Sequence, residues 1–125
     1  MDEKFSFEIF DIVKNRNGYI YYKVYINGVC QFDDFCKEVA LVPRNNNSLV
    51  YILSLMEKFS SVLMPQKKFR QIKGIGRSDV FEFKKDQVRV YVVKDSTKFY
   101  IIMGSSKNNQ PEDIKRLRSR LRGFE

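Results

Sequence analysis

Apolar and polar positions alternate along the first part of the chain, which is the pattern of β-strands. The alternation runs through residues 5–14 and resumes from Tyr19 to Ile26. Between these two segments, Asn17-Gly18 tolerates the positive φ that a tight hairpin turn requires. The pattern therefore predicts an N-terminal β-hairpin over residues 1–27.

The pattern then changes to apolar positions three and four residues apart, which is the spacing of helices. Residues 32–40 favour a short helix, and residues 44–47 are expected to form a polar loop after it. Ser48 is a suitable N-cap for a second helix, which Pro65 would close. The apolar face of this second helix consists of Leu49, Ile52, Leu53, Met56, Phe59 and Leu63. We expect helices within residues 32–64, with the second helix at the centre of the core.

Three apolar-rich segments follow, separated by short polar connections. They span Val80–Lys84, Val88–Lys94 and Phe99–Met103. The connections over residues 85–87 and 95–97 have the length of hairpin loops. The segment over residues 80–104 is therefore expected to form an antiparallel β-meander.

The last pattern is that of a helix over residues 111–122. Pro111 suits the first helical turn, and Glu112 and Asp113 favour the positive end of the helix dipole. Basic residues flank an apolar stripe made of Ile114, Leu117, Leu121 and Phe124. Together the patterns predict one α+β domain over residues 1–125, with an antiparallel sheet packed against helices.

The charge of the chain is unevenly distributed. Residues 67–125 contain 16 Lys and Arg against 7 Asp and Glu, a net charge of +9. Residues 1–66 contain 7 against 8, a net charge of −1. Because the basic half also alternates most cleanly, we expect its charges on ordered elements. An ordered basic face is typical of proteins that bind a polyanion.

Residue types that are absent or rare exclude several classes of chemistry. The chain has no histidine, which excludes Ser-His-Asp and Cys-His catalysis. Its two cysteines, Cys30 and Cys36, are too few for a tetrahedral zinc site. Their spacing is not that of a C-x-x-C redox pair, so we expect reduced thiols that pack in the interior. We therefore expect neither a metal nor a cofactor.

The sequence predicts no targeting or membrane-spanning segment. The N-terminus lacks a basic and then apolar signal peptide. The longest apolar-rich stretch, Leu49 to Met64, is interrupted by serine and charged residues and is too polar to span a bilayer. We therefore expect a cytoplasmic protein with no membrane partner.

The loop Lys73-Gly74-Ile75-Gly76-Arg77-Ser78 has glycines that can bring backbone N–H groups close to a phosphate. It lacks the Gly-Lys-Ser/Thr ending of a P-loop and precedes a strand rather than a helix. A flexible turn is therefore the favoured interpretation, with Arg77 as a residue that can still contact a phosphate.

Five motifs follow one another between Phe69 and Phe124. They are Lys73-Gly74, Val80-Phe81-Glu82-Phe83-Lys84, Val88-Arg89-Val90-Tyr91, Phe99-Tyr100-Ile101-Ile102-Met103-Gly104-Ser105-Ser106-Lys107, and a basic helix from Pro111 to Leu121. In this order they resemble the RelE/ParE superfamily of bacterial toxins, most of all its HigB-like, phage-derived branch. The chain departs from that family where Met103 and Ser105 replace the His and Phe of a His-Gly-Phe motif. It also lacks a late Tyr or His.

The resemblance implies a RelE-like fold with an extra N-terminal hairpin, and the activity of an mRNA interferase. Such toxins cut messenger RNA on the ribosome without a metal, and a cognate antitoxin protein neutralises them. The 2′-hydroxyl attacks its own phosphodiester, and clustered cations stabilise the dianionic phosphorane that forms. The residue match gives Lys84, Arg89 and Lys107 as catalytic residues. We expect RNA-binding roles for Lys73, Arg77, Tyr91, Arg118 and Arg122, with Tyr91 stacking on a base.

Two alternatives remain open at the level of the sequence. A catalytically inactive protein of the same fold, binding RNA or a partner protein, fits the missing His and the missing late Tyr. A ParE-like inhibitor would instead use its basic residues to bind a topoisomerase.

Overall fold

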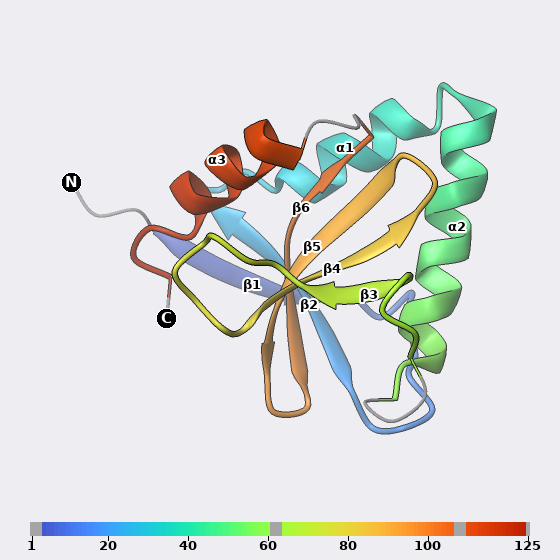
Figure 1. Cartoon of the computed structure of the whole chain (residues 1–125), viewed down its shortest axis with the longest axis horizontal. Helices are drawn as coiled ribbons and strands as arrows, with labels where there is room; N and C mark the ends of the chain where they lie inside the picture. The colour runs from blue at the N-terminus through green and yellow to red at the C-terminus, as the bar shows by residue number, and fades with distance from the viewer. Residues whose placement is uncertain (1–3, 61–63, 107–109, 125) are drawn as a thin grey trace.

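The computed structural model describes residues 4–60, 64–106 and 110–124, which form a six-stranded mixed sheet and three helices (Figure 1). In chain order the elements are β1 (Phe5–Ile9), β2 (Ile20–Ile26), α1 (Gln31–Val39), α2 (Pro43–Lys58), β3 (Phe69–Gln71), β4 (Val80–Lys85), β5 (Val88–Asp95), β6 (Lys98–Ser105) and α3 (Gln110–Arg120). The strand order across the sheet is β1-β2-β6-β5-β4-β3. The predicted α+β class is confirmed.

The sheet is mixed rather than purely antiparallel, which corrects the sequence-based prediction. β1 pairs antiparallel with β2, and β3, β4, β5 and β6 pair antiparallel in that order. β2, however, runs parallel to β6. After β2 the chain passes through α1 and α2 to β3 at the other edge of the sheet, and it comes back beside β2 only with β6, the last strand. Parallel neighbours require such a long connection. The predicted meander over residues 80–104 is formed by β4, β5 and β6.

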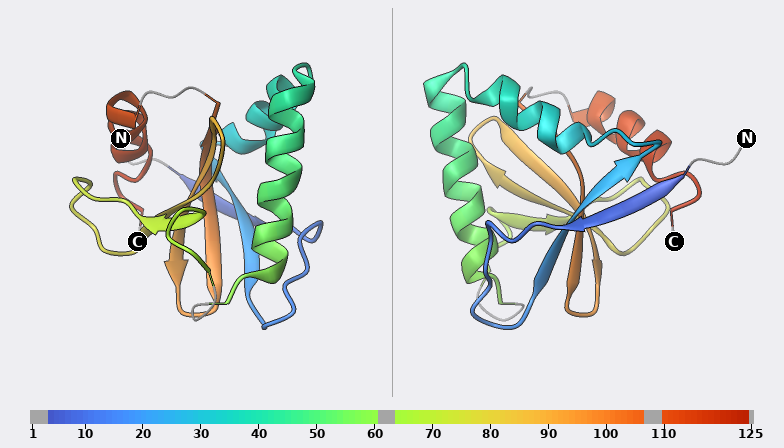
Figure 2. Two further views of the ribbon diagram at one scale, coloured as in Figure 1. Left: turned by 45° about the vertical axis from the view of Figure 1, so that its right-hand side comes forward. Right: turned by 180° about the vertical axis from the view of Figure 1, so that it is seen from behind.

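Helices pack on both faces of the sheet (Figure 2). One face carries α1 and α2 over an aromatic core that includes Phe32, Phe59, Phe83 and Phe99. The other face carries α3 over a second core that includes Ile72, Tyr91, Leu117, Leu121 and Phe124. Most residues of the central strands β5 and β6 are therefore buried.

The second helix begins and ends earlier than the sequence predicts. It starts at Pro43, because proline at the first helical position already has the required φ. Residues 44–47, predicted as a loop, are therefore helical, and Ser48 is buried inside the helix instead of capping it. The helix stops at Lys58, well before Pro65. Of the predicted apolar stripe, Leu63 lies outside the described residues.

Side chains from the β1–β2 region bind the C-terminal end of α2. The Asn15 amide donates to the carbonyl oxygens of Met56 and Phe59 at 2.8 and 3.1 Å. The Asn17 amide donates to Phe59 at 2.9 Å, and the buried Tyr21 hydroxyl donates to Met56 at 2.8 Å. These bonds satisfy carbonyl groups that a helix end leaves without intrahelical partners, so they define where α2 ends.

The contact between α1 and β6 centres on Gly104. The ring of Phe35 lies so close that a Cβ on Gly104 would be 2.5 Å from its Cε2 and 2.7 Å from its Cγ. The Gln31 side chain binds both backbone groups of Gly104, donating to its oxygen at 2.9 Å and accepting from its nitrogen at 2.8 Å. Glycine is therefore required here by the close approach of α1.

The described residues contain no helix that is long and apolar enough to cross a membrane. Within the same ranges, no three side chains of the His, Cys, Asp or Glu type are grouped so as to hold a metal ion. Cys30 and Cys36 are free thiols. Burial, together with the nearby Asp33, raises the pKa of Cys36 to about 11, so this thiol is protonated at neutral pH.

Candidate nucleic-acid interface

Lys84 and Arg89 lie opposite each other at the end of the β4–β5 hairpin. They are register partners, and Asp86 and Gln87 form the turn that joins their strands. Asp86 has a φ of 54°, the left-handed conformation that a two-residue hairpin turn needs. Opposed side chains point to the same face of a sheet. Tyr91, two positions beyond Arg89, packs under α3, so both cations lie on the face that carries α3.

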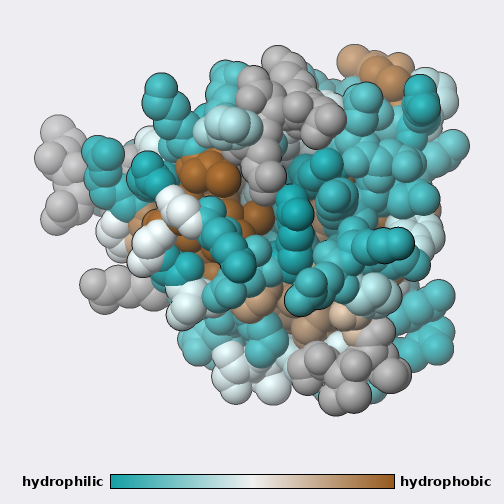
Figure 3. Space-filling model, viewed as in Figure 1, coloured by the Kyte–Doolittle hydropathy of each residue, from teal (hydrophilic) through white to brown (hydrophobic). Residues whose placement is uncertain are grey.

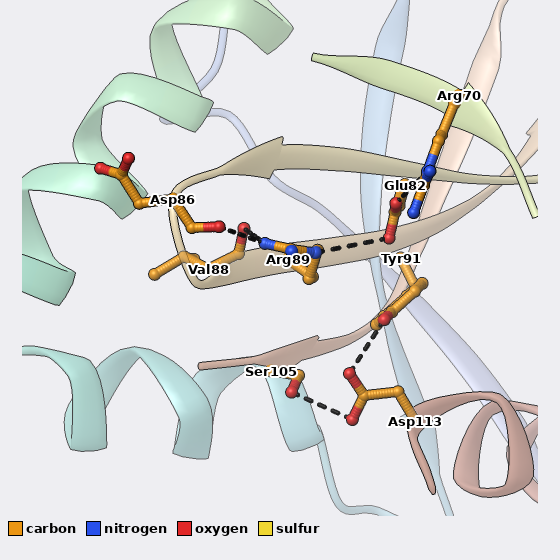
Figure 4. A network of polar contacts seen from close by, with 8 residues as sticks. All are labelled: Arg70, Glu82, Asp86, Val88, Arg89, Tyr91, Ser105 and Asp113. Carbon is orange, nitrogen blue, oxygen red and sulfur yellow. Dashed lines mark hydrogen bonds and ion pairs between the residues drawn. The ribbon is translucent and has the colours of Figure 1, made fainter. Parts of the chain in front are cut away.

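Glu82 is the buried centre of this group of cations (Figure 4). Its side chain has 0% exposure and lies between Arg70 of β3 and Arg89 of β5. Its Oε1 accepts a hydrogen bond from Arg70 Nε at 2.5 Å, and its Oε2 lies 3.8 Å from Arg89 Nε. Oε2 accepts no hydrogen bond from any described residue. A buried carboxylate requires compensating charge, so Glu82 positions both arginines.

Arg89 and Lys84 differ in how firmly the protein holds them. Arg89 Nη1 donates to the carbonyl oxygens of Asp86 and Val88 at 2.5 and 3.2 Å, and the side chain is only 12% exposed. Lys84 is half-buried, and its side chain makes no hydrogen bond or ion pair with any described residue. We call Arg70, Lys84 and Arg89 the cation cluster. Lys107, the third predicted catalytic residue, lies outside the described residues.

Tyr91 is not on an open face, which corrects its predicted role in stacking on a base. Its ring is fully buried, and its hydroxyl donates to Asp113 Oδ2 at 2.9 Å. The Ser105 hydroxyl donates to the other oxygen of the same carboxylate at 3.0 Å. Burial and the Asp113 carboxylate raise the pKa of Tyr91 well above its ordinary value. The phenol therefore stays protonated and anchors the first turn of α3 on the sheet.

Arg77 is bound within the protein rather than presented to a phosphate. Its Nε and Nη2 donate to the two carboxylate oxygens of Asp79 at 2.9 and 2.8 Å. Its Nη1 donates to the carbonyl oxygen of Phe124 at 2.7 Å. The guanidinium holds the pKa of Asp79 below its usual range. The predicted phosphate contact is thus replaced by a link between the loop before β4 and the segment after α3.

Of the other predicted RNA-binding residues, Lys73, Arg118 and Arg122 are all exposed. Arg118 Nη2 donates to the carbonyl oxygen of Gly74, which ties α3 to the loop after β3. Arg118 lies about 7.5 Å further along α3 than Asp113, which accepts hydrogen bonds from Tyr91 and Ser105. Lys73 lines a pocket together with Arg70, a member of the cation cluster.

The sequence did not identify Arg70, Glu82 and Asp113 as members of this site. Arg70 lies on β3, which is three residues long and therefore too short for a detectable alternation. Glu82 could have been found as an acidic residue within a mostly apolar strand segment, where burial demands a partner. Asp113 was assigned only to the helix dipole, yet its side chain is 2% exposed and accepts two hydrogen bonds.

The surface above the cluster is polar. Seen from the side of Figure 1, hydrophilic side chains gather over β3, β4 and β5 (Figure 3). No family model, curated protein or solved structure matches the chain. The chemistry of this surface therefore indicates the class of ligand.

Proposed function

We propose that the protein is the toxin of a toxin–antitoxin pair, an endoribonuclease that cuts messenger RNA on the ribosome without a metal. One observation carries this proposal. Lys84 and Arg89 face each other across β4 and β5, with Arg70 beside them, on the face opposite α1 and α2. Three cations around one buried carboxylate leave a net positive site, which is suited to a phosphodiester.

The order of the elements supports the same proposal. Two helices precede an antiparallel meander, and a basic helix closes the chain. This is the order of features by which the sequence resembles the RelE/ParE superfamily. The proposed function also implies a cytoplasmic protein and a cognate antitoxin that covers the cation cluster.

The cluster provides what cleavage by the 2′-hydroxyl requires. Attack of the 2′-oxygen on the phosphorus breaks the bond to the 5′-oxygen and passes through a dianionic phosphorane. Arg89 and Arg70, both held by Glu82, can stabilise the developing negative charge without reorganising. The Lys84 ammonium group, which has no described partner, can donate a proton to the departing 5′-oxygen. The 2′-hydroxyl proton passes to solvent as the 2′-oxygen attacks, so that one proton leaves the 2′-oxygen and one arrives at the 5′-oxygen.

A second candidate function is RNA binding without cleavage. The observation in its favour is the burial of Tyr91, whose hydroxyl is bonded to Asp113 and cannot reach a substrate. Among the described side chains of the cluster, Lys84 is then the only one that makes no hydrogen bond or ion pair. It is therefore the one described proton donor left for cleavage. In this candidate the cluster would hold RNA and leave it intact.

Induced expression tests the proposal directly. We expect the native protein to stop bacterial growth and to fragment transcripts. Lys84→Ala should slow cleavage by about 100-fold, because it removes the group that protonates the departing 5′-oxygen, and growth should recover. This variant removes no side-chain hydrogen bond or ion pair between described residues, so its folding should be unchanged. The readouts are growth rate and transcript integrity.

Lys98→Ala is the matched control. It removes an equal charge at the start of β6, whereas Arg89 pairs with Ser105 at the other end of that strand, and Lys98 is exposed. It should remain as toxic as the native protein. Growth arrest with intact transcripts would contradict the endonuclease and favour the second candidate. Normal growth with intact transcripts for the native protein would contradict the toxin function itself.

A further inference from the structure

A pocket of about 510 Å³ lies beside the cation cluster, between β3 and α3. Its lining consists of Gln66, Arg70, Gln71, Lys73 and Ile114. The pocket exists because β3 adds an edge strand next to β4, a strand that belongs to none of the motifs recognised in the sequence. It therefore requires an explanation of its own.

The lining residues combine charge, amide groups and one apolar side chain, and they include no carboxylate. Arg70 is the most firmly placed of them, because its Nε donates to the fully buried Glu82 at 2.5 Å. A guanidinium held in this way keeps its plane in a fixed orientation. The same Glu82 also holds Arg89, so the pocket and the Lys84–Arg89 pair are joined through one carboxylate.

A nucleobase fits this lining better than a free phosphate does. A flat base can stack on a guanidinium plane and contact an apolar side chain such as Ile114. The amide groups of Gln66 and Gln71 can bind the edge of a base. The Gln71 amide nitrogen donates to Ser78 at 2.7 Å, which leaves its oxygen as an acceptor for an exocyclic amino group. A phosphate would use neither Ile114 nor that oxygen.

We propose that this pocket binds one nucleotide of a single-stranded RNA. Its base lies against Arg70 and Ile114, and its phosphate lies at Lys73. The neighbouring phosphate along the strand then reaches Lys84 and Arg89. Since Gln71 offers an acceptor, a base with an exocyclic amino group such as adenine binds better than uracil. The proposal rests on the proposed function only in taking RNA as the ligand.

The test measures by anisotropy the binding of a fluorescently labelled adenosine dinucleotide that carries both phosphates, with an abasic nucleotide at either position in turn, because so short a strand offers a single register. One position should weaken binding to the native protein by about tenfold, because stacking of one base is lost there. Uracil at that position should weaken binding less than the abasic nucleotide does. Equal affinity for both abasic dinucleotides and the intact one, or no binding of the intact dinucleotide, would overturn the proposal.

Two variants separate the pocket from general charge. Arg70→Lys keeps the charge but removes the plane, so it should abolish the difference between intact and abasic RNA. Lys73→Ala should reduce the log–log slope of affinity against salt by about 0.7, the value for one phosphate contact in a single strand. Lys98→Ala should leave the abasic difference and its position unchanged. If Arg70→Lys retained the full difference, the base would not lie on Arg70.

Free nucleotide is the other source of the same chemistry. Adenosine monophosphate should compete poorly, because it lacks the neighbouring phosphate that binds Lys84 and Arg89. Competition at the concentration of the oligonucleotide would overturn the proposal in favour of a free-nucleotide site. Failure here is distinguishable from failure of the proposed function. A protein that cleaves RNA but ignores abasic positions has no base pocket, and one that senses an abasic position without cleaving has the pocket alone.

Discussion

Replacing Glu82 with alanine is expected to lower the free energy of unfolding by about 3 kcal/mol, because removing one partner of a buried ion pair leaves the other uncompensated. Arg89 is the residue most affected, since its side chain is 12% exposed and Glu82 is its only described ion-pair partner. Arg70 is more exposed, at 40%, and should regain part of its hydration. The measurement is unfolding in urea followed by circular dichroism.

The same substitution should weaken RNA binding although it removes a negative charge. On charge alone, removal of a carboxylate would make the site more positive and strengthen RNA binding. Weaker binding would therefore show that Glu82 acts by positioning Arg70 and Arg89. Glu82→Gln keeps an oxygen acceptor for Arg70 Nε and should lose only about 1 kcal/mol of stability. Tighter RNA binding by Glu82→Ala at full stability would contradict the assigned role.

Replacing Gly104 with alanine is expected to destabilise the protein by about 3 kcal/mol, at the upper end of the cost of overpacking. The added methyl group would meet the ring of Phe35, with Cε2 at 2.5 Å and Cγ at 2.7 Å. That ring is 2% exposed and packs against Phe32, so it has little room to move. Gln31 also holds Gly104 through both backbone groups, so the strand cannot retreat easily. Urea unfolding measures the loss.

A compensating substitution provides the control for this steric explanation. Phe35→Leu alone should cost about 1–2 kcal/mol, because it removes buried apolar volume. Combined with Gly104→Ala it should cost clearly less than the sum of the two, since the smaller side chain makes room for the methyl group. Additive losses would mean that Gly104 is required for a reason other than contact with Phe35.

Sequence patterns predicted the elements whose burial is local. The meander strands begin and end within two residues of their predicted limits, because alternation with a period of two reports directly which side chains face the core. The start of α2 was missed because the polar residues 44–47 were expected to form a loop, although Pro43 before them is favourable at the first helical position. The pairing of β2 with β6 joins distant parts of the chain, which no local pattern encodes.

The candidate site shows the same division between local and distant determinants. The sequence placed Lys84 and Arg89 on neighbouring strands, and their pairing follows once the two-residue turn is known. It placed Tyr91 on the side of Arg89, but whether that position is open depends on where α3 docks. Arg70 lies on a strand that exists through its pairing with β4. Its place beside Glu82 is therefore a tertiary property.

The chemistry of cleaved RNA ends is the most direct test of the central claim, that the cation cluster promotes attack by the 2′-hydroxyl. Purified protein would be incubated with ribosomes engaged on a defined messenger RNA, and the ends of the fragments would be mapped and analysed. Fragments with 2′,3′-cyclic phosphate and 5′-hydroxyl ends, formed by the native protein and Lys98→Ala but about 100-fold more slowly by Lys84→Ala, are the predicted result. Intact RNA, or fragments with 3′-hydroxyl ends, would contradict the account.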